Sequence, residues 1–149
     1  MRLIKNKFKL LVRQIAVTIV IGLSSGLIYM SLELIYRGFT HWSSFLMGFI
    51  AGAFICDPLN NNSFKWDDPL IIQMTISSIC ITLMEYCVGK LVNTDYSVWD
   101  YRDCLWNVEG MVCLGASLLW GILSLIPIFL GDFIRWKFFG EDKPKYKWI

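Results

Sequence analysis

This chain of 149 residues contains little histidine and lacks the cysteine spacings that are typical of metal or redox sites. His41 is the only histidine, and the five cysteines form no Cys-x-x-Cys pair. Most of the cysteines lie in apolar runs, where cysteine behaves as a small hydrophobic residue. A zinc site would need more ligands than these residues supply, and an odd number of cysteines does not suggest a disulfide framework. We therefore expect no metal and no cofactor.

Motifs that bind phosphate or activate a nucleophile are also missing. The sequence Val-Gly-Lys at 88–90 lacks both the first glycine and the hydroxyl residue of a phosphate-binding loop. There is no nucleophile elbow, no His-Glu-x-x-His and no second histidine for base catalysis. An enzyme built on this chain would have to work with carboxylates alone.

Apolar and aromatic residues are abundant instead. Hydrophobic residues make up 56% of the chain and aromatic residues 15%, with 7 tryptophans, whereas charged residues make up only 17%. The mean hydropathy is +0.52. Soluble domains contain about 45–50% apolar residues, and tryptophan gathers at the two interfaces of a membrane. The composition predicts a single membrane domain over residues 1–149.

Basic residues gather at the two ends of the chain. Both clusters adjoin apolar stretches, which is typical of the cytoplasmic flanks of a membrane bundle. Nucleic-acid binding is the other interpretation of basic ends, but the adjoining apolar stretches argue against it, and we expect no nucleic-acid partner. The residues concerned are Arg2, Lys5, Lys7, Lys9 and Arg13 at one end, and Arg135, Lys137, Lys143, Lys145 and Lys147 at the other.

The apolar stretches predict an all-α protein with four transmembrane helices, arranged as two hairpins. A helix of about 20 apolar residues crosses a bilayer. The first stretch is too long for the apolar part of a signal peptide, so we expect it to be retained. Pro127 should kink the last helix. The predicted helices are 14–36, 42–58, 70–92 and 108–133, with basic ends 1–13 and 134–149 and a short interfacial helix or loop before the last helix.

The second predicted helix is the ambiguous one. Its uninterrupted apolar run, residues 45–56, is short enough for a re-entrant segment. Three crossings would then place the two basic ends on opposite sides of the membrane. Since basic flanks favour the cytoplasm, the charge pattern favours four crossings with both termini cytoplasmic.

Glycines and other small residues recur three or four positions apart on each predicted helix. Such spacing lets two helix backbones approach closely, and pore lining is the other interpretation. We favour packing, including self-association into a homo-oligomer. The glycines assigned to helix packing are Gly22, Gly26, Gly48, Gly52, Gly110 and Gly121.

Two carboxylates lie within the predicted membrane helices. Glu33 and Glu85 each lie one to two turns inside the end of a helix. A carboxylate in that position is costly unless it is paired or hydrated, and so it marks a functional site by default. Arg37 is four residues from Glu33 and can pair with it. One interpretation is an outward-facing pocket for a cation, a proton or a substrate amine, and the other is a structural clamp between helices.

The segment 93–107 carries a second group of polar and aromatic residues. Trp99, Asp100, Tyr101 and Asn107 suggest a recognition loop over the pocket, whereas Trp106 is more typical of an aromatic belt. The other interpretation for the whole group is an interfacial belt with hydrated acids.

Three segments resemble a family of small bacterial membrane proteins classed with type IV ABC transporters, the CmpB-like permeases. They are Val-Trp-Asp-Tyr at 98–101, Trp-Asn-Val-Glu-Gly-Met-Val-Cys-Leu at 106–114 and Ser-Leu-Leu-Trp-Gly at 117–121. Arg102 replaces a serine that is usual in that family. The resemblance implies a helical protein of the bacterial inner membrane, with its ATPase on a separate chain. It points to Glu33, Arg37, Glu85, Trp99, Asp100, Tyr101, Asn107, Gly110, Trp120 and Gly121.

Taken together, the sequence predicts a multi-pass membrane protein that transports or binds a small polar or cationic solute as a permease-like subunit. Four helices are few for a complete solute path, so a homo-oligomer or another membrane subunit is expected. Two alternatives stay open. One is a membrane enzyme that acts on lipid or a small substrate through Asp100, Asp103 and Glu85, and the other is a non-catalytic assembly or regulatory subunit.

Overall fold

The computed structural model describes residues 2–65 and 67–149. Four helical stretches are long and apolar enough to cross a membrane, namely Lys7–Arg37, Trp42–Ser63, Leu70–Val92 and Leu114–Phe139. Large apolar side chains remain exposed along their outer faces, as a lipid environment allows. The prediction of an all-α membrane protein with four spanning helices is confirmed.

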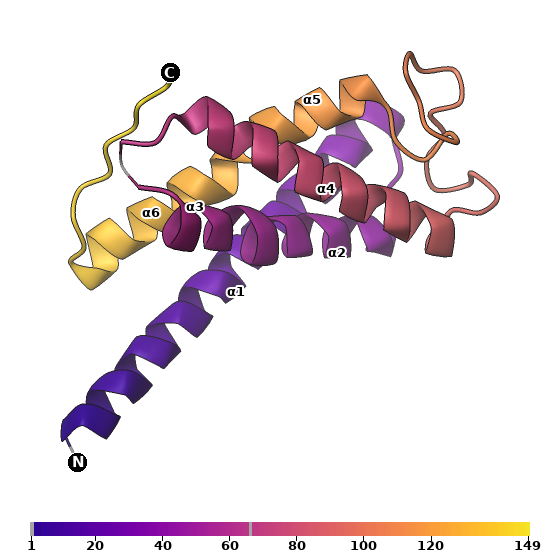
Figure 1. Cartoon of the computed structure of the whole chain (residues 1–149). Helices are drawn as coiled ribbons and strands as arrows, with labels where there is room; N and C mark the ends of the chain where they lie inside the picture. Colours follow the sequence, from indigo (N-terminus) through magenta and orange to yellow (C-terminus); the bar gives the residue numbers. More distant parts are fainter. Residues whose placement is uncertain (1, 66) are drawn as a thin grey trace.

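Helix α1 runs without a break over Arg2–Arg37, so the basic lead-in is not a separate segment as expected. No glycine or proline precedes Gly22 in this stretch, and nothing interrupts the helical hydrogen bonds. With 36 residues, the helix is about 54 Å long, against about 30 Å for the hydrocarbon core. Its first turns project away from the other helices (Figure 1).

Helix α2, Trp42–Ile50, packs closely against α1 through glycines. A methyl group on Gly48 would lie 2.7 Å from the carbonyl oxygen of Ser25, and one on Gly26 would lie 2.8 Å from that of Phe45. Backbone atoms cannot give way as the end of a side chain can, so only glycine fits at these positions. A methyl group on Gly22 would collide with the ring of Phe49 in α2, and one on Gly52 would collide with the side chain of Ser25 in α1.

The second spanning stretch continues past the predicted end at Pro58. A π-helix, η1 over Ala51–Cys56, follows α2 and leads into α3, Asp57–Ser63. The N–H of Asp57 donates to the carbonyl of Gly52, five residues back. Pro58 lies in the first turn of α3, where a missing N–H and a fixed φ are tolerated. The stretch thereby reaches a spanning length that its apolar run alone did not suggest.

Helix α4, Leu70–Val92, has the predicted limits, but the last spanning stretch does not. Residues 108–113 belong to the loop, because Glu109 and Gly110 adopt φ of 52° and 66° and cannot continue a right-handed helix. Helix α5 begins only at Leu114 and covers Leu114–Leu123. Gly110 is therefore a turn residue. The predicted helix start at Val108 had placed it inside the helix, as a helix-packing residue.

The last helical stretch is interrupted at Ser124, three residues before Pro127, and the helix continues as α6, Leu125–Phe139. The predicted kink is therefore close to Pro127, whose ring removes a helical hydrogen bond. Gly140, with φ of 74°, ends α6 beyond the predicted end at Phe133. The tail 140–149 folds back along the bundle, and the N–H of Leu70 donates to the carbonyl of Lys147 at 2.7 Å.

The two ends of the bundle differ in what holds them together. At the tail end, Arg135 donates both terminal nitrogens to the carboxylate of Asp57, each at 2.7 Å, and both side chains are buried. At the opposite end, which we call the loop end, the loop 93–113 covers the ends of α1 and α4 (Figure 1). The ion pair joins residues 78 positions apart and ties the middle of the chain to α6.

Substitution of Gly48 by alanine should destabilise the α1–α2 contact by about 1–3 kcal/mol, because overpacking forces the two backbones apart. Gly115 in α5 has nothing within 4 Å of an added methyl group. Gly115→Ala is therefore the matched control and should be neutral or slightly stabilising. Reversible unfolding in mixed micelles would measure both. Equal stability of the two variants would contradict the close contact.

Substitution of Arg135 by leucine should destabilise the protein by about 3–5 kcal/mol, because it leaves the Asp57 carboxylate buried without a counter-charge. The double variant Asp57→Leu/Arg135→Leu should recover a large part of this loss. The same unfolding measurement applies. A double variant less stable than Arg135→Leu alone would show that the pair contributes more than mutual charge compensation.

Candidate functional site

The carboxylate of Glu85 lies at the centre of a polar cluster at the loop end. Glu85 is on the inward face of α4 and only 1% of its surface is exposed. The indole Nε1 of Trp120 in α5 donates to it at 2.9 Å, and the hydroxyl of Tyr101 in the loop donates at 3.3 Å. Two neutral donors from two other elements thus replace the water that this carboxylate loses on burial.

An aromatic ring from α1, that of Tyr29, lies beside this cluster. The ring of Tyr29 lies 4.8 Å from that of Trp120, at an interplanar angle of 58°. Tyr29 is close enough to interact electrostatically with both Glu85 and Glu33. Burial and the nearby Glu85 raise the pKa of the Tyr101 hydroxyl, so this hydroxyl stays protonated and can donate.

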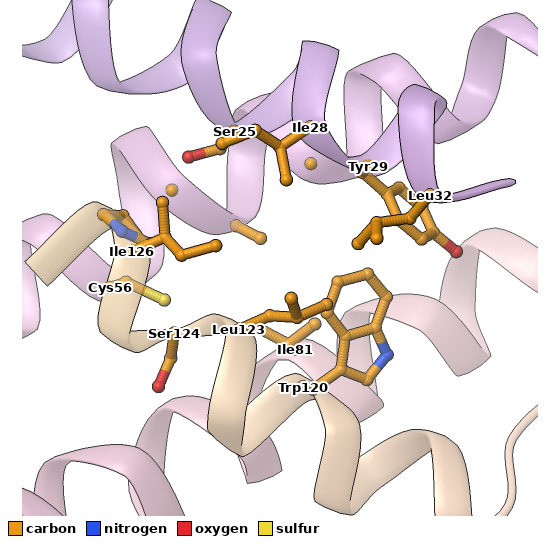
Figure 2. A pocket seen from close by; sticks show the side chains of 14 residues that line it. Ser25, Ile28, Tyr29, Leu32, Cys56, Ile81, Trp120, Leu123, Ser124 and Ile126 are labelled. Atoms are coloured by element: carbon orange, nitrogen blue, oxygen red, sulfur yellow. The ribbon is translucent and has the colours of Figure 1, made fainter. Parts of the chain in front are cut away.

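A small apolar cavity lies next to the cluster, in the middle of the bundle. Tyr29 and Trp120 border one side of it, and Cys56 of η1 lies on another (Figure 2). Its volume is about 30 Å³, which is enough for a very small number of water molecules. The Ser25 hydroxyl also lines it and has no hydrogen-bond partner among the described residues. This volume is too small for an organic solute.

Glu33 forms its own pair beside this cluster. Arg37 donates to the Glu33 carboxylate and also to the carbonyl of Val98, and Thr40 donates to Glu33 at 2.7 Å. Only 7% of Glu33 is exposed. The guanidinium of Arg37 therefore compensates Glu33 and at the same time fastens the loop to the end of α1. Glu33 and Glu85 are near enough to interact electrostatically.

The loop is held chiefly by Asn93, which follows the last residue of α4 and is fully buried. Its Nδ2 donates to the carbonyl of Trp99 at 2.6 Å, and its Oδ1 accepts from the N–H groups of Val98 and Trp99. Trp99 in turn donates through Nε1 to the carbonyl of Met111 at 2.8 Å. Its ring packs over Gly89, where a methyl group would lie 3.1 Å from it.

The remaining predicted loop residues lie away from Glu85. Asp100 is bonded to Arg102 through both carboxylate oxygens, and this guanidinium lowers the pKa of the Asp100 carboxyl. Asn107 accepts from the N–H of Gly110 at 3.1 Å and donates to the carbonyl of Cys104 at 2.9 Å. Both side chains therefore shape the loop, and neither has a hydrogen bond to the Glu85 cluster.

The structure brings together Glu85, Tyr101 and Trp120, with Glu33 and Arg37 beside them. Trp99, Asp100 and Asn107 lie in the loop around this group. The sequence prediction did not assign Tyr29 or Asn93 to the site. Tyr29 shares the helix face of Gly22, Gly26 and Glu33, and this pattern marks it as inward-facing. No such sequence pattern marks Asn93 as buried.

Replacement of Asn93 by alanine should release the loop, because it removes three hydrogen bonds that converge on one buried side chain. Each is worth about 0.5–1.5 kcal/mol. Arg102 is exposed in this loop, so trypsin cleavage after Arg102 should become faster. Asn62→Ala is the control, since Asn62 is exposed and accepts one long bond of 3.5 Å. An unchanged cleavage rate in Asn93→Ala would rule out the clamp.

Neither the curated proteins nor the solved structures contain a significant match to this chain. The model of one family, described as "Putative ABC-transporter type IV", matches residues 14–148. This match covers most of the first spanning stretch, the other three in full, the Glu85 cluster and nearly all of the folded-back tail, and the chain therefore belongs to that ABC-transporter family.

Proposed function

We propose that this chain is a permease-like membrane subunit that binds a small cationic solute at Glu85. The observation that carries the proposal is a deeply buried carboxylate whose described partners, Trp120 and Tyr101, are both neutral. Within the described part of the chain, no ion pair joins Glu85 to a basic side chain, whereas Glu33 is paired with Arg37. An ionised Glu85 thus leaves one negative charge uncompensated, which a bound cation would neutralise.

The surroundings of Glu85 also suit a cation. The rings of Tyr29 and Trp120 lie near the carboxylate, with centroids 4.8 Å apart and an interplanar angle of 58°. A cation against a ring face would gain about 0.5–2 kcal/mol. The Tyr101 bond is the longer of the two to Glu85, and Tyr101 belongs to a loop. An arriving cation would therefore displace Tyr101 more readily than Trp120, whose helix is packed against α4.

Membership of the family supports a role in transport. Because the sequence contains no phosphate-binding loop, the energy of ATP would have to come from a separate ATPase chain. The cavity beside the Glu85 cluster measures only about 30 Å³, which favours a homo-oligomer or another membrane subunit as the complete path. The basic ends favour the bacterial inner membrane with both termini in the cytoplasm.

The proposal is tested by calorimetric titration of tetramethylammonium into the purified protein in lipid nanodiscs. Glu85→Gln should weaken binding at least tenfold, because it removes the uncompensated charge while preserving the shape of the side chain. Tyr101→Phe is the matched control and should bind as well as wild type or better, since it removes only the competing hydroxyl. Equal affinity in wild type and Glu85→Gln, or flux into liposomes that survives Glu33→Gln and Glu85→Gln, would refute it.

A further inference from the structure

A second cavity lies at the tail end, far from the Glu85 cluster. Its walls come from α3, the first turn of α4, the end of α6 and the folded-back tail. Its volume is about 330 Å³, within the range of about 300–1,000 Å³ that is usual for small-molecule sites. The side chains that matter for its chemistry are Asn60, Gln73, Asp132, Arg135, Lys145 and Tyr146.

The walls of this cavity are fixed by bonds between separate elements. Asn60 of α3 donates to Asp132 of α6 at 2.8 Å, and the hydroxyl of Tyr146 in the tail donates to the same carboxylate at 3.0 Å. Burial and the neighbouring Asp132 raise the pKa of Tyr146, which keeps its hydroxyl a donor. The tail is also fastened to α4 through its backbone. The cavity is therefore formed before any ligand arrives.

One acceptor in the wall has no donor. Gln73, in the first turn of α4, is 5% exposed, and its Oε1 is buried without a hydrogen-bond partner among the described residues. An unpaired buried acceptor is rare in folded proteins and calls for an explanation. A donor brought by a ligand or by water would satisfy it.

The charges in the wall determine what kind of donor fits. Arg135 is the basic group deepest in the wall, but both its terminal nitrogens are engaged by Asp57. Asp132 is 7% exposed, accepts hydrogen bonds from Asn60 and Tyr146, and is near enough to Arg135 to interact with it electrostatically. Lys65 and Lys145 are exposed at the rim, where Glu141 and Asp142 offset them. Since Arg135 is compensated by Asp57, the Asp132 carboxylate leaves the buried wall with a net negative charge, which favours a cation with N–H donors over an anion.

We infer that the tail-end cavity is a binding site for a small protonated amine, which donates to Gln73 Oε1 and is attracted by the Asp132 carboxylate. This site is independent of the one proposed at Glu85. The two differ in chemistry, because the Glu85 site offers aromatic faces that accept a cation without N–H groups. The tail-end site requires N–H donors.

The test is calorimetric titration of putrescine and of tetramethylammonium into the full chain in nanodiscs. Putrescine carries N–H donors, whereas tetramethylammonium carries charge without them. Putrescine should bind to wild type and to Glu85→Gln alike. Gln73→Leu should weaken putrescine binding at least tenfold and leave the Tm unchanged or higher, because the wild-type acceptor makes no hydrogen bond to the described residues.

Gln73→Glu supplies a second variant if Gln73→Leu does not fold. It keeps an acceptor at the same place and adds a negative charge, so putrescine should bind at least as tightly as to wild type. The inference is overturned if wild type binds neither putrescine nor methylammonium, since the cavity then holds water only. It is also overturned if Gln73→Leu binds putrescine as wild type does, or if Gln73→Glu loses binding while remaining folded. None of these results bears on tetramethylammonium binding at Glu85.

Discussion

The burial of one carboxylate governs the arrangement of the loop end. Glu85 is removed from water at a depth where an unsatisfied charge would be very costly. Its donors come from α5 and from the loop, and the ring of Tyr29 in α1 packs on one of them. Elements that are distant in sequence must therefore meet at this point. The order of the loop, which Asn93 and Arg37 secure, is a condition for supplying the Tyr101 hydroxyl.

At the tail end, a buried carboxylate is compensated by an ion pair instead of by neutral donors alone. Asp57 and Arg135 compensate each other, and Asp132 receives its donors from Asn60 and Tyr146. The apolar middle of the bundle separates the two polar regions. A small cavity lies in this middle, lined mainly by apolar side chains (Figure 2). The buried polar groups thus lie at both ends of a closely packed bundle. The glycine contacts keep α1 and α2 close together.

The sequence predicted the spanning stretches well because length and hydrophobicity are local properties. It also predicted that Glu33 and Glu85 are special, since a carboxylate on an apolar helix is conspicuous by itself. It could not predict which donors reach Glu85, because Trp120 is 35 residues away. The pair of Asp57 and Arg135 was missed for the same reason. Each residue was interpreted alone, Asp57 at the end of the second predicted helix and Arg135 as part of a basic flank. The segment from Val108 to Cys113 misled the prediction, since the apolar side chains of Met111, Val112 and Cys113 are buried in a turn and not in a helix.

The π-helix at Ala51–Cys56 explains a regularity of the sequence around it. Ser44, Gly48, Gly52 and Cys56 are spaced by four residues throughout, and all are buried. In an α-helix of 3.6 residues per turn, positions four apart drift by about 40° at each step, so such a row would wind away from its neighbour. A wider turn, with hydrogen bonds to the fifth residue, rotates less per residue and reverses the drift. The constant spacing of four residues in the sequence therefore reflects a helix whose rotation per residue changes along its length.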